Sequence, residues 1–221
     1  MKDQKKTCRN DKDGYNGNLT IVTGYNTDGC SSYLKSDFEN YLNDNAAKSI
    51  RNRSIVYITP EYLFDVNPTE TIGAIEYIEP GIKEIDDEIE RVLSGANDCN
   101  EPGTRIFRKL QSLIKQGVLR KDTVLIWDGV ENFLHPQWQV IMSGLLVKFA
   151  KNGIHIKAKT FSPYIVQGIR FFSNKHKISP VYLLIQRGRS GSKSVDIVTH
   201  DLNRVFIMFA LPLDSIVNLV D

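Results

Sequence analysis

Cysteine is scarce in this chain, with 3 among 221 residues. Cys8, Cys30 and Cys99 pair neither with one another nor with a histidine at metal-ligand spacing, which excludes a disulfide framework and a zinc finger. Long hydrophobic runs are missing as well: the longest, Val205 to Leu211, is far shorter than the roughly 20 residues of a membrane-spanning helix. We therefore expect a cytoplasmic protein that keeps its thiols reduced and does not enter membranes.

An excess of charge of one sign is also absent. Lys and Arg number 28 and Asp and Glu 26, so the net charge of +2 creates no global field that would attract nucleic acid or an anionic membrane. Hydrophobic residues make up 41% and charged residues 24%, which excludes a disordered chain. Residues 1–17 are polar and lack the apolar stretch of a signal peptide. We expect a flexible polar segment over 1–17 and a single domain over 18–221.

Hydrophobic patterning predicts strands that alternate with helices. Short β-branched runs predict strands, and apolar residues three and four apart predict helices. The expected strands cover 19–23, 54–59, 123–127, 154–159, 181–186 and 195–199, and the expected helices cover 31–43, 83–93, 106–114, 137–151, 163–173 and the tail from 202. This alternation is typical of an α/β domain with a mostly parallel central sheet flanked by helices. Ligands bind such sheets beyond the carboxyl ends of the strands.

The segment after the first expected strand is close to a phosphate-binding loop. Such loops read G-x-x-x-x-G-K-[ST] between a strand and a helix, and their backbone N–H groups hold phosphate. Gly24 and Gly29 have this spacing, and Ser31 stands where the hydroxyl that binds Mg²⁺ would be. Cys30 occupies the place of the lysine. An ordinary glycine-containing turn from strand to helix is the alternative interpretation.

Two further strand ends carry polar residues. Asp128 follows the apolar run TVLIW, in the arrangement of a Walker B acid that holds a metal ion. An aspartate at a strand end is also common as a turn or cap residue. Thr160-Phe161-Ser162-Pro163 follows the next strand, where a serine before proline indicates the start of a helix.

Taken together, the three segments resemble the ABC-type ATPase group that includes the SMC, RecF and OLD-nuclease ATPases, often labelled AAA-type ATPases. That group carries L-I-D-E-P-E-N-x-L-H-P, then a helix, a strand and T-H-S-P-Y. This chain reads LIWDGVENFLHPQWQ, a helix, IHIKAKT and TFSPY, and its start, LTIVTGYNTDGCSSYL, matches the strand, phosphate loop and helix of the group. The resemblance covers residues 19–173 and implies a P-loop domain of ABC-ATPase type.

The resemblance also implies ligands, site residues and partners. Active members bind ATP and Mg²⁺, hydrolyse ATP and form head-to-tail homodimers. Carried over by position, the residues that would cradle the phosphates are Gly24, Asn26, Gly29, Cys30, Ser31 and Ser32, and Ser31 and Asp128 would hold Mg²⁺. A role with nucleic acid is implied by the resemblance alone.

The chain departs from the group at the residues that carry the chemistry. Cys30 replaces the phosphate-binding lysine, Gly129 stands at the general-base position, and Phe161 stands at the position of the switch histidine. Loss of a general base costs on the order of 10²–10⁴-fold in rate, and loss of an electrostatic stabiliser costs about 10²–10³-fold. We therefore predict a hydrolysis-deficient domain with weak nucleotide binding or none, so that ATP and Mg²⁺ are its cofactors only if the site still binds.

Several alternatives remain open at this point. The domain could be a non-catalytic pseudo-ATPase that serves as a protein-interaction module for a partner protein. It could equally be a parent ATPase whose chemistry was removed deliberately. A further hypothesis is that Cys30 acts as a nucleophile; the alternative is that it is an inert residue in a turn. Arg187, Arg189 and Lys193 fit either a solvated hairpin loop or a contact with nucleic-acid phosphates.

Overall fold

The computed structural model describes residues 18–25, 29–47, 54–59, 78–96, 101–187 and 192–217, with only the backbone described for 44–47. These ranges form an α/β domain with a mostly parallel sheet flanked by helices, which confirms the predicted fold class. The predicted N-terminal segment 1–17 lies outside the described residues, as do Asn26 and Arg189. No helix within the described ranges is long and apolar enough to span a membrane.

Within the described ranges, six strands form one sheet, and all of them were predicted. They are β1 (Leu19–Gly24), β2 (Ile55–Ile58), β3 (Val124–Asp128), β4 (His155–Lys159), β5 (Val181–Arg187) and β6 (Lys193–Ile197). Their spatial order is β2-β3-β4-β1-β5-β6; among these described strands, β5 and β6 pair antiparallel and the other neighbours pair parallel. The last strand begins and ends earlier than the expected range 195–199, because the hairpin pairs Lys193 with Arg187.

The helices also agree with the predicted pattern, with small differences at their ends. They are α1 (Cys30–Ala47), α2 (Pro80–Ser94), α3 (Pro102–Lys115), α4 (Pro136–Lys151), α5 (Pro163–His176) and α6 (Asn203–Val217). Helix α3 begins at Pro102 rather than at the expected residue 106. Proline is favoured in a first helical turn because its fixed φ suits the helix and its missing N–H would have no helical partner there.

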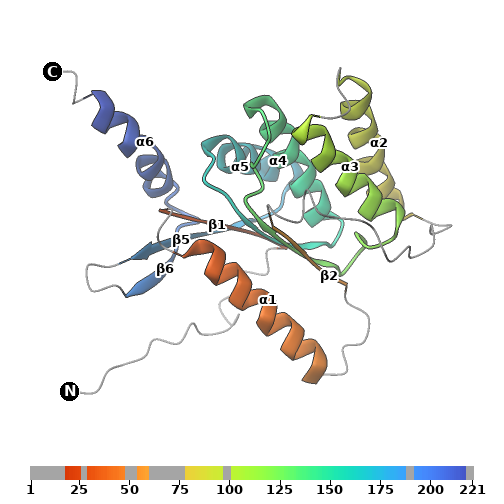
Figure 1. Cartoon of the computed structure of the whole chain (residues 1–221), viewed down its shortest axis with the longest axis horizontal. Coiled ribbons are helices and arrows are strands. Elements are labelled where there is room, and N and C mark those ends of the chain that lie inside the picture. Colours follow the sequence, from red (N-terminus) through yellow and green to blue (C-terminus); the bar gives the residue numbers. More distant parts are fainter. Residues whose placement is uncertain are drawn as a thin grey trace.

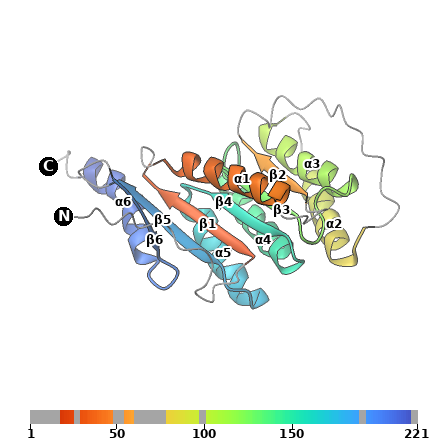
Figure 2. The same ribbon diagram turned by 90° about the horizontal axis from the view of Figure 1, so that it is seen from below.

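The two faces of the sheet are covered unequally. Figures 1 and 2 show α1 crossing one face, while α2, α3, α4 and α5 cover the other. The larger apolar cluster lies on the side of those four helices and includes Phe107, Trp127 and Phe149. A smaller cluster under α1 includes Val22, Cys30 and Leu34. The face under α1 therefore has less apolar material, and charged side chains occur there.

Side-chain caps fix where the chain turns after β3 and β4. His135 accepts a hydrogen bond from the backbone N–H of Gln137, and Ser162 accepts from those of Tyr164 and Ile165. Proline follows each cap at the first helical position. The cap at Ser162 agrees with the helix start predicted there, and both caps hold the segments between strand and helix at one edge of the sheet.

Candidate functional site

The three polar strand ends meet at one edge of the sheet. Strand β4 lies between β1 and β3, and all three run parallel, so their carboxyl ends are neighbours. The register places Lys159 of β4 beside Val22 of β1 on one side and beside Asp128 of β3 on the other. The segments that follow β1, β3 and β4, which are far apart in the sequence, are thereby brought together.

Lys159 occupies the centre of this edge. Its Nζ donates to Asp128 Oδ1 at 2.7 Å and to Ser31 Oγ at 2.8 Å. The two charged side chains are largely buried, at 14% exposure for Lys159 and 9% for Asp128. Ser31 and Asp128 are the two residues predicted to hold a metal ion, and the structure joins them through one ammonium group.

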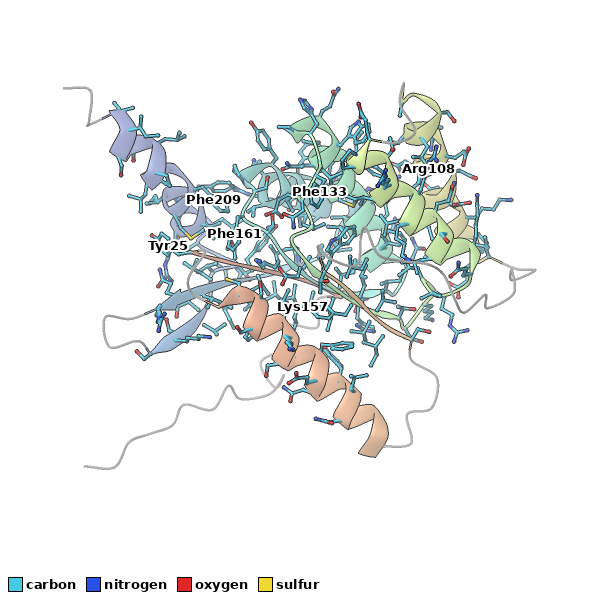
Figure 3. The ribbon with its side chains drawn as sticks, in the orientation of Figure 1. Tyr25, Arg108, Phe133, Lys157, Phe161 and Phe209 are labelled. Carbon is cyan, nitrogen blue, oxygen red and sulfur yellow. The ribbon has the colours of Figure 1, made fainter. Side chains whose placement is uncertain are left out.

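Phe161 forms one wall of the site. Its ring centroid lies 4.8 Å from the Lys159 ammonium, within the range of a cation–π contact. Its backbone N–H donates to Glu131 Oε1 at 2.8 Å, which ties the segment after β4 to the segment after β3. Figure 3 shows Phe161 at the same end of the sheet as Tyr25, the residue that follows β1. Residue 161, the position predicted for a switch histidine, thus holds a ring that contacts a cation and has no side-chain hydrogen-bond donor.

Gly24 is required by sheet packing whether or not a ligand binds. A Cβ added to it would lie 2.3 Å from the backbone oxygen of Ile185 and 3.0 Å from the Cys30 Sγ. Strands β1 and β5 therefore approach so closely here that only glycine fits. The close packing of the two strands is therefore enough to explain a glycine at position 24.

Cys30 belongs to the core. Its side chain is 3% exposed and packs with Val22, Leu34 and Ile185 in the cluster under α1. A lysine placed here would bring its apolar stem into this cluster. The burial also speaks against Cys30 as a nucleophile, because its sulfur is closed off from a substrate. Only the backbone of residue 30 remains a predicted phosphate contact.

A second lysine reaches the end of the phosphate-loop segment. Gly29 has a φ of +80°, and a Cβ added to it would lie 2.4 Å from the Lys193 Nζ. Lys193 comes from the exposed start of β6, so this ammonium contacts the loop from another element. Ser31 and Ser32 are exposed in the first turn of α1, which begins at Cys30. The phosphate-binding roles of Gly29, Ser31 and Ser32 stay predictions.

Residue 129, the position predicted for a general base, has a backbone conformation that favours glycine. Gly129 has a φ of +80°, a conformation that costs roughly 1–2 kcal/mol for a residue with a side chain. A Cβ there would also lie 2.2 Å from the Asn132 Nδ2. The backbone after Asp128 therefore favours glycine over any residue with a side chain.

Sequence reasoning missed Lys159, although a signal was present. The run HIKAK alternates, which places Lys157 and Lys159 on the same face of β4. Lys157 pairs with Asp37 of α1, and Figure 3 shows it between that helix and the sheet. Burial lowers the pKa of Lys157, but the attraction of Asp37, Tyr33 and Tyr41 outweighs burial and raises the pKa overall. Both lysines therefore point toward α1, and Lys159, at the end of β4, forms an ion pair with Asp128.

A cavity lies away from this edge. It has a volume of about 820 Å³ and is lined by Asn18, Arg170, Ser173, Tyr182 and His200, among others. Burial raises the pKa of Tyr182, whose hydroxyl has no hydrogen-bond partner within the described part of the chain. None of the predicted site residues lines this cavity. Across the described ranges, no three His, Cys, Asp or Glu side chains gather as a metal site would require.

No family model matches this chain. The curated proteins likewise contain no match. Among solved structures, the chain is similar to the dimeric structure of MJ0796, a bacterial ABC transporter cassette, at 15% identity. The match covers 76% of this chain and 82% of that one, with a TM-score of 0.45. A likeness of this size does not extend to activity, ligands or assembly.

Proposed function

We propose that this chain is a P-loop ATPase-like domain of the ABC type that binds the phosphates of ATP weakly and does not hydrolyse ATP. The observation that carries the proposal is the meeting of Ser31 and Asp128 at Lys159. These two residues come from two separate motifs of the family resemblance. Their meeting supports the proposal, because the resemblance places both residues at a single phosphate and metal site.

The proposed absence of hydrolysis rests on three residues at the same edge of the sheet, Cys30, Gly129 and Phe161. Phosphoryl transfer depends mainly on positioning and on stabilisation of charge. The side chain of Cys30 is in the core, Gly129 has no group that could activate water, and Phe161 has no side-chain donor. We do not extend the proposal to ATP-driven head-to-tail dimers, because the loop lysine and the phosphate sensor are both replaced.

A protein-interaction module is the second candidate, and α6 favours it. Val205 and Met208 anchor the first half of this helix in the core. Its second half extends away from the body of the domain (Figure 1) and exposes Leu211, Leu213, Ile216 and Val217. Apolar side chains gathered on one projecting element are typical of a surface that binds another protein.

Thermal melting with ATP distinguishes the two candidates. A ligand that binds only the folded state stabilises it increasingly as its concentration exceeds the Kd, so ATP at concentrations above its Kd is expected to raise the melting temperature of the wild type. Lys193→Glu is expected to reduce this shift, because it reverses the charge beside Gly29. Lys175→Glu is the matched control, since it makes the same charge change in the last turn of α5.

The outcomes separate clearly. Equal ATP shifts in Lys193→Glu and Lys175→Glu would place the nucleotide away from the loop and contradict the proposed site. No shift in any of the three proteins would contradict nucleotide binding and leave the interaction module as the function.

A further inference from the structure

We infer that the Lys159 ammonium takes the place of the divalent cation, so that the Ser31–Asp128 pair is a metal-excluding site with a built-in positive charge. This inference concerns the chain's own residues and holds whether or not ATP binds. The family resemblance implies Mg²⁺ between Ser31 and Asp128, whereas the structure places the amino group of Lys159 there.

The contacts of Lys159 leave no place for the metal. Mg²⁺ requires oxygen ligands at about 2.0–2.1 Å in an octahedral arrangement. Ser31 Oγ and Asp128 Oδ1 instead lie 2.8 and 2.7 Å from Lys159 Nζ, the distances of hydrogen bonds to an ammonium. A dication held by the same two oxygens would lie within a few ångströms of this ammonium and would be repelled by it. Metal binding therefore requires Lys159 to leave.

Several features hold Lys159 in place. Its backbone lies in β4 between two parallel neighbours, so the strand itself cannot shift without breaking the sheet. The side chain is 14% exposed, which leaves few other positions for the ammonium. The ring of Phe161 covers it at 4.8 Å. A phenylalanine at the position predicted for the switch histidine therefore suits this site, because its ring attracts the Lys159 ammonium.

The neighbouring lysine of β4 shows what is particular to this site. Lys157 faces the same side of the sheet but pairs with Asp37 in the middle of α1. Neither Lys157 nor Asp37 matches a metal-ligand position of the family motifs. Lys159 is therefore the lysine that the inference assigns to the metal position, and Lys157 is its natural control.

Paramagnetic broadening by Mn²⁺ tests this inference on the full chain without nucleotide. The amide NMR signals of Ser31 and Asp128 are followed in the wild type, in Lys159→Met and in Lys157→Met. In the wild type, Mn²⁺ is expected to broaden these signals no more than those of exposed carboxylate residues. In Lys159→Met the same broadening should need an Mn²⁺ concentration at least about tenfold lower, because the repelling charge is gone. Lys157→Met should behave as the wild type.

Each outcome decides the matter. Broadening in the wild type at the concentrations effective for Lys159→Met would overturn the inference, because the metal then binds beside the lysine. Absence of selective broadening in Lys159→Met would also overturn it, since Lys159 would not be what excludes the metal. Lys159→Gln, which can still donate to Asp128, replaces Lys159→Met if that variant fails to fold. Because no nucleotide is present, the result is independent of the melting experiment with ATP.

Discussion

Replacing Gly24 by alanine is expected to destabilise the domain by about 3 kcal/mol, the upper part of the range for overpacked cores. The added Cβ would lie 2.3 Å from the backbone oxygen of Ile185, and a backbone atom cannot move aside as a flexible side chain can. Relief would require β1 and β5 to separate where Gly24 pairs with Ile185. Urea unfolding followed by circular dichroism measures the loss.

Gly144→Ala is the matched control for this substitution. A Cβ at Gly144 would lie 3.5 Å from the ring of Phe172, which is ordinary contact. Gly144 is inside α4, where alanine is favoured over glycine by about 0.5–1 kcal/mol. Gly144→Ala should therefore be neutral or stabilising. A Gly24→Ala variant as stable as the wild type would show that β1 and β5 do not approach as described.

Truncation of Trp127 is expected to have the largest effect on stability, a loss of about 3–5 kcal/mol for Trp127→Ala. Trp127 is 1% exposed, belongs to the larger apolar cluster and lies in β3 directly before Asp128. Its neighbours in the sheet are Ile58 and Ala158. The cavity left by alanine would therefore loosen the end of β3 as well as the core. Guanidinium unfolding of both proteins measures the difference.

Trp127→Phe separates the loss of packing from the cost of a buried indole N–H that has no partner among the described residues. The indole Nε1 is buried and has no hydrogen-bond partner among the described residues. A buried polar group without a partner costs about 1–3 kcal/mol, so its removal offsets part of the lost packing. Trp127→Phe should cost less than half as much as Trp127→Ala. Equal losses in the two variants would contradict the placement of this side chain.

The fold could be predicted from the sequence because its hydrophobic patterns are strong. The run TVLIW has the continuous apolar character of a strand covered on both faces, and β3 is buried throughout. The start of α5 followed from a serine before a proline, at Ser162. The first turn of α3 was missed because its residues, Pro102 to Arg105, resemble a loop in composition.

The candidate site could be predicted only in part. The motif residues indicated which strand ends to compare, and the sheet order then brought Ser31 and Asp128 together. The role of Lys159 depends on β4 lying between β1 and β3, which no local pattern specifies. The burial of Cys30 and the positive φ of Gly129 are likewise tertiary and conformational facts, and neither can be read from the residue type.

The measurement that tests the central claim most directly is phosphate release from Mg-ATP under single-turnover conditions, with protein in excess. Asp128→Asn sets the background, because it removes the carboxylate that the family mechanism needs. The missing base and the missing donor together predict a rate for the wild type equal to that background. A saturable release of phosphate by the wild type that Asp128→Asn abolishes would contradict the account.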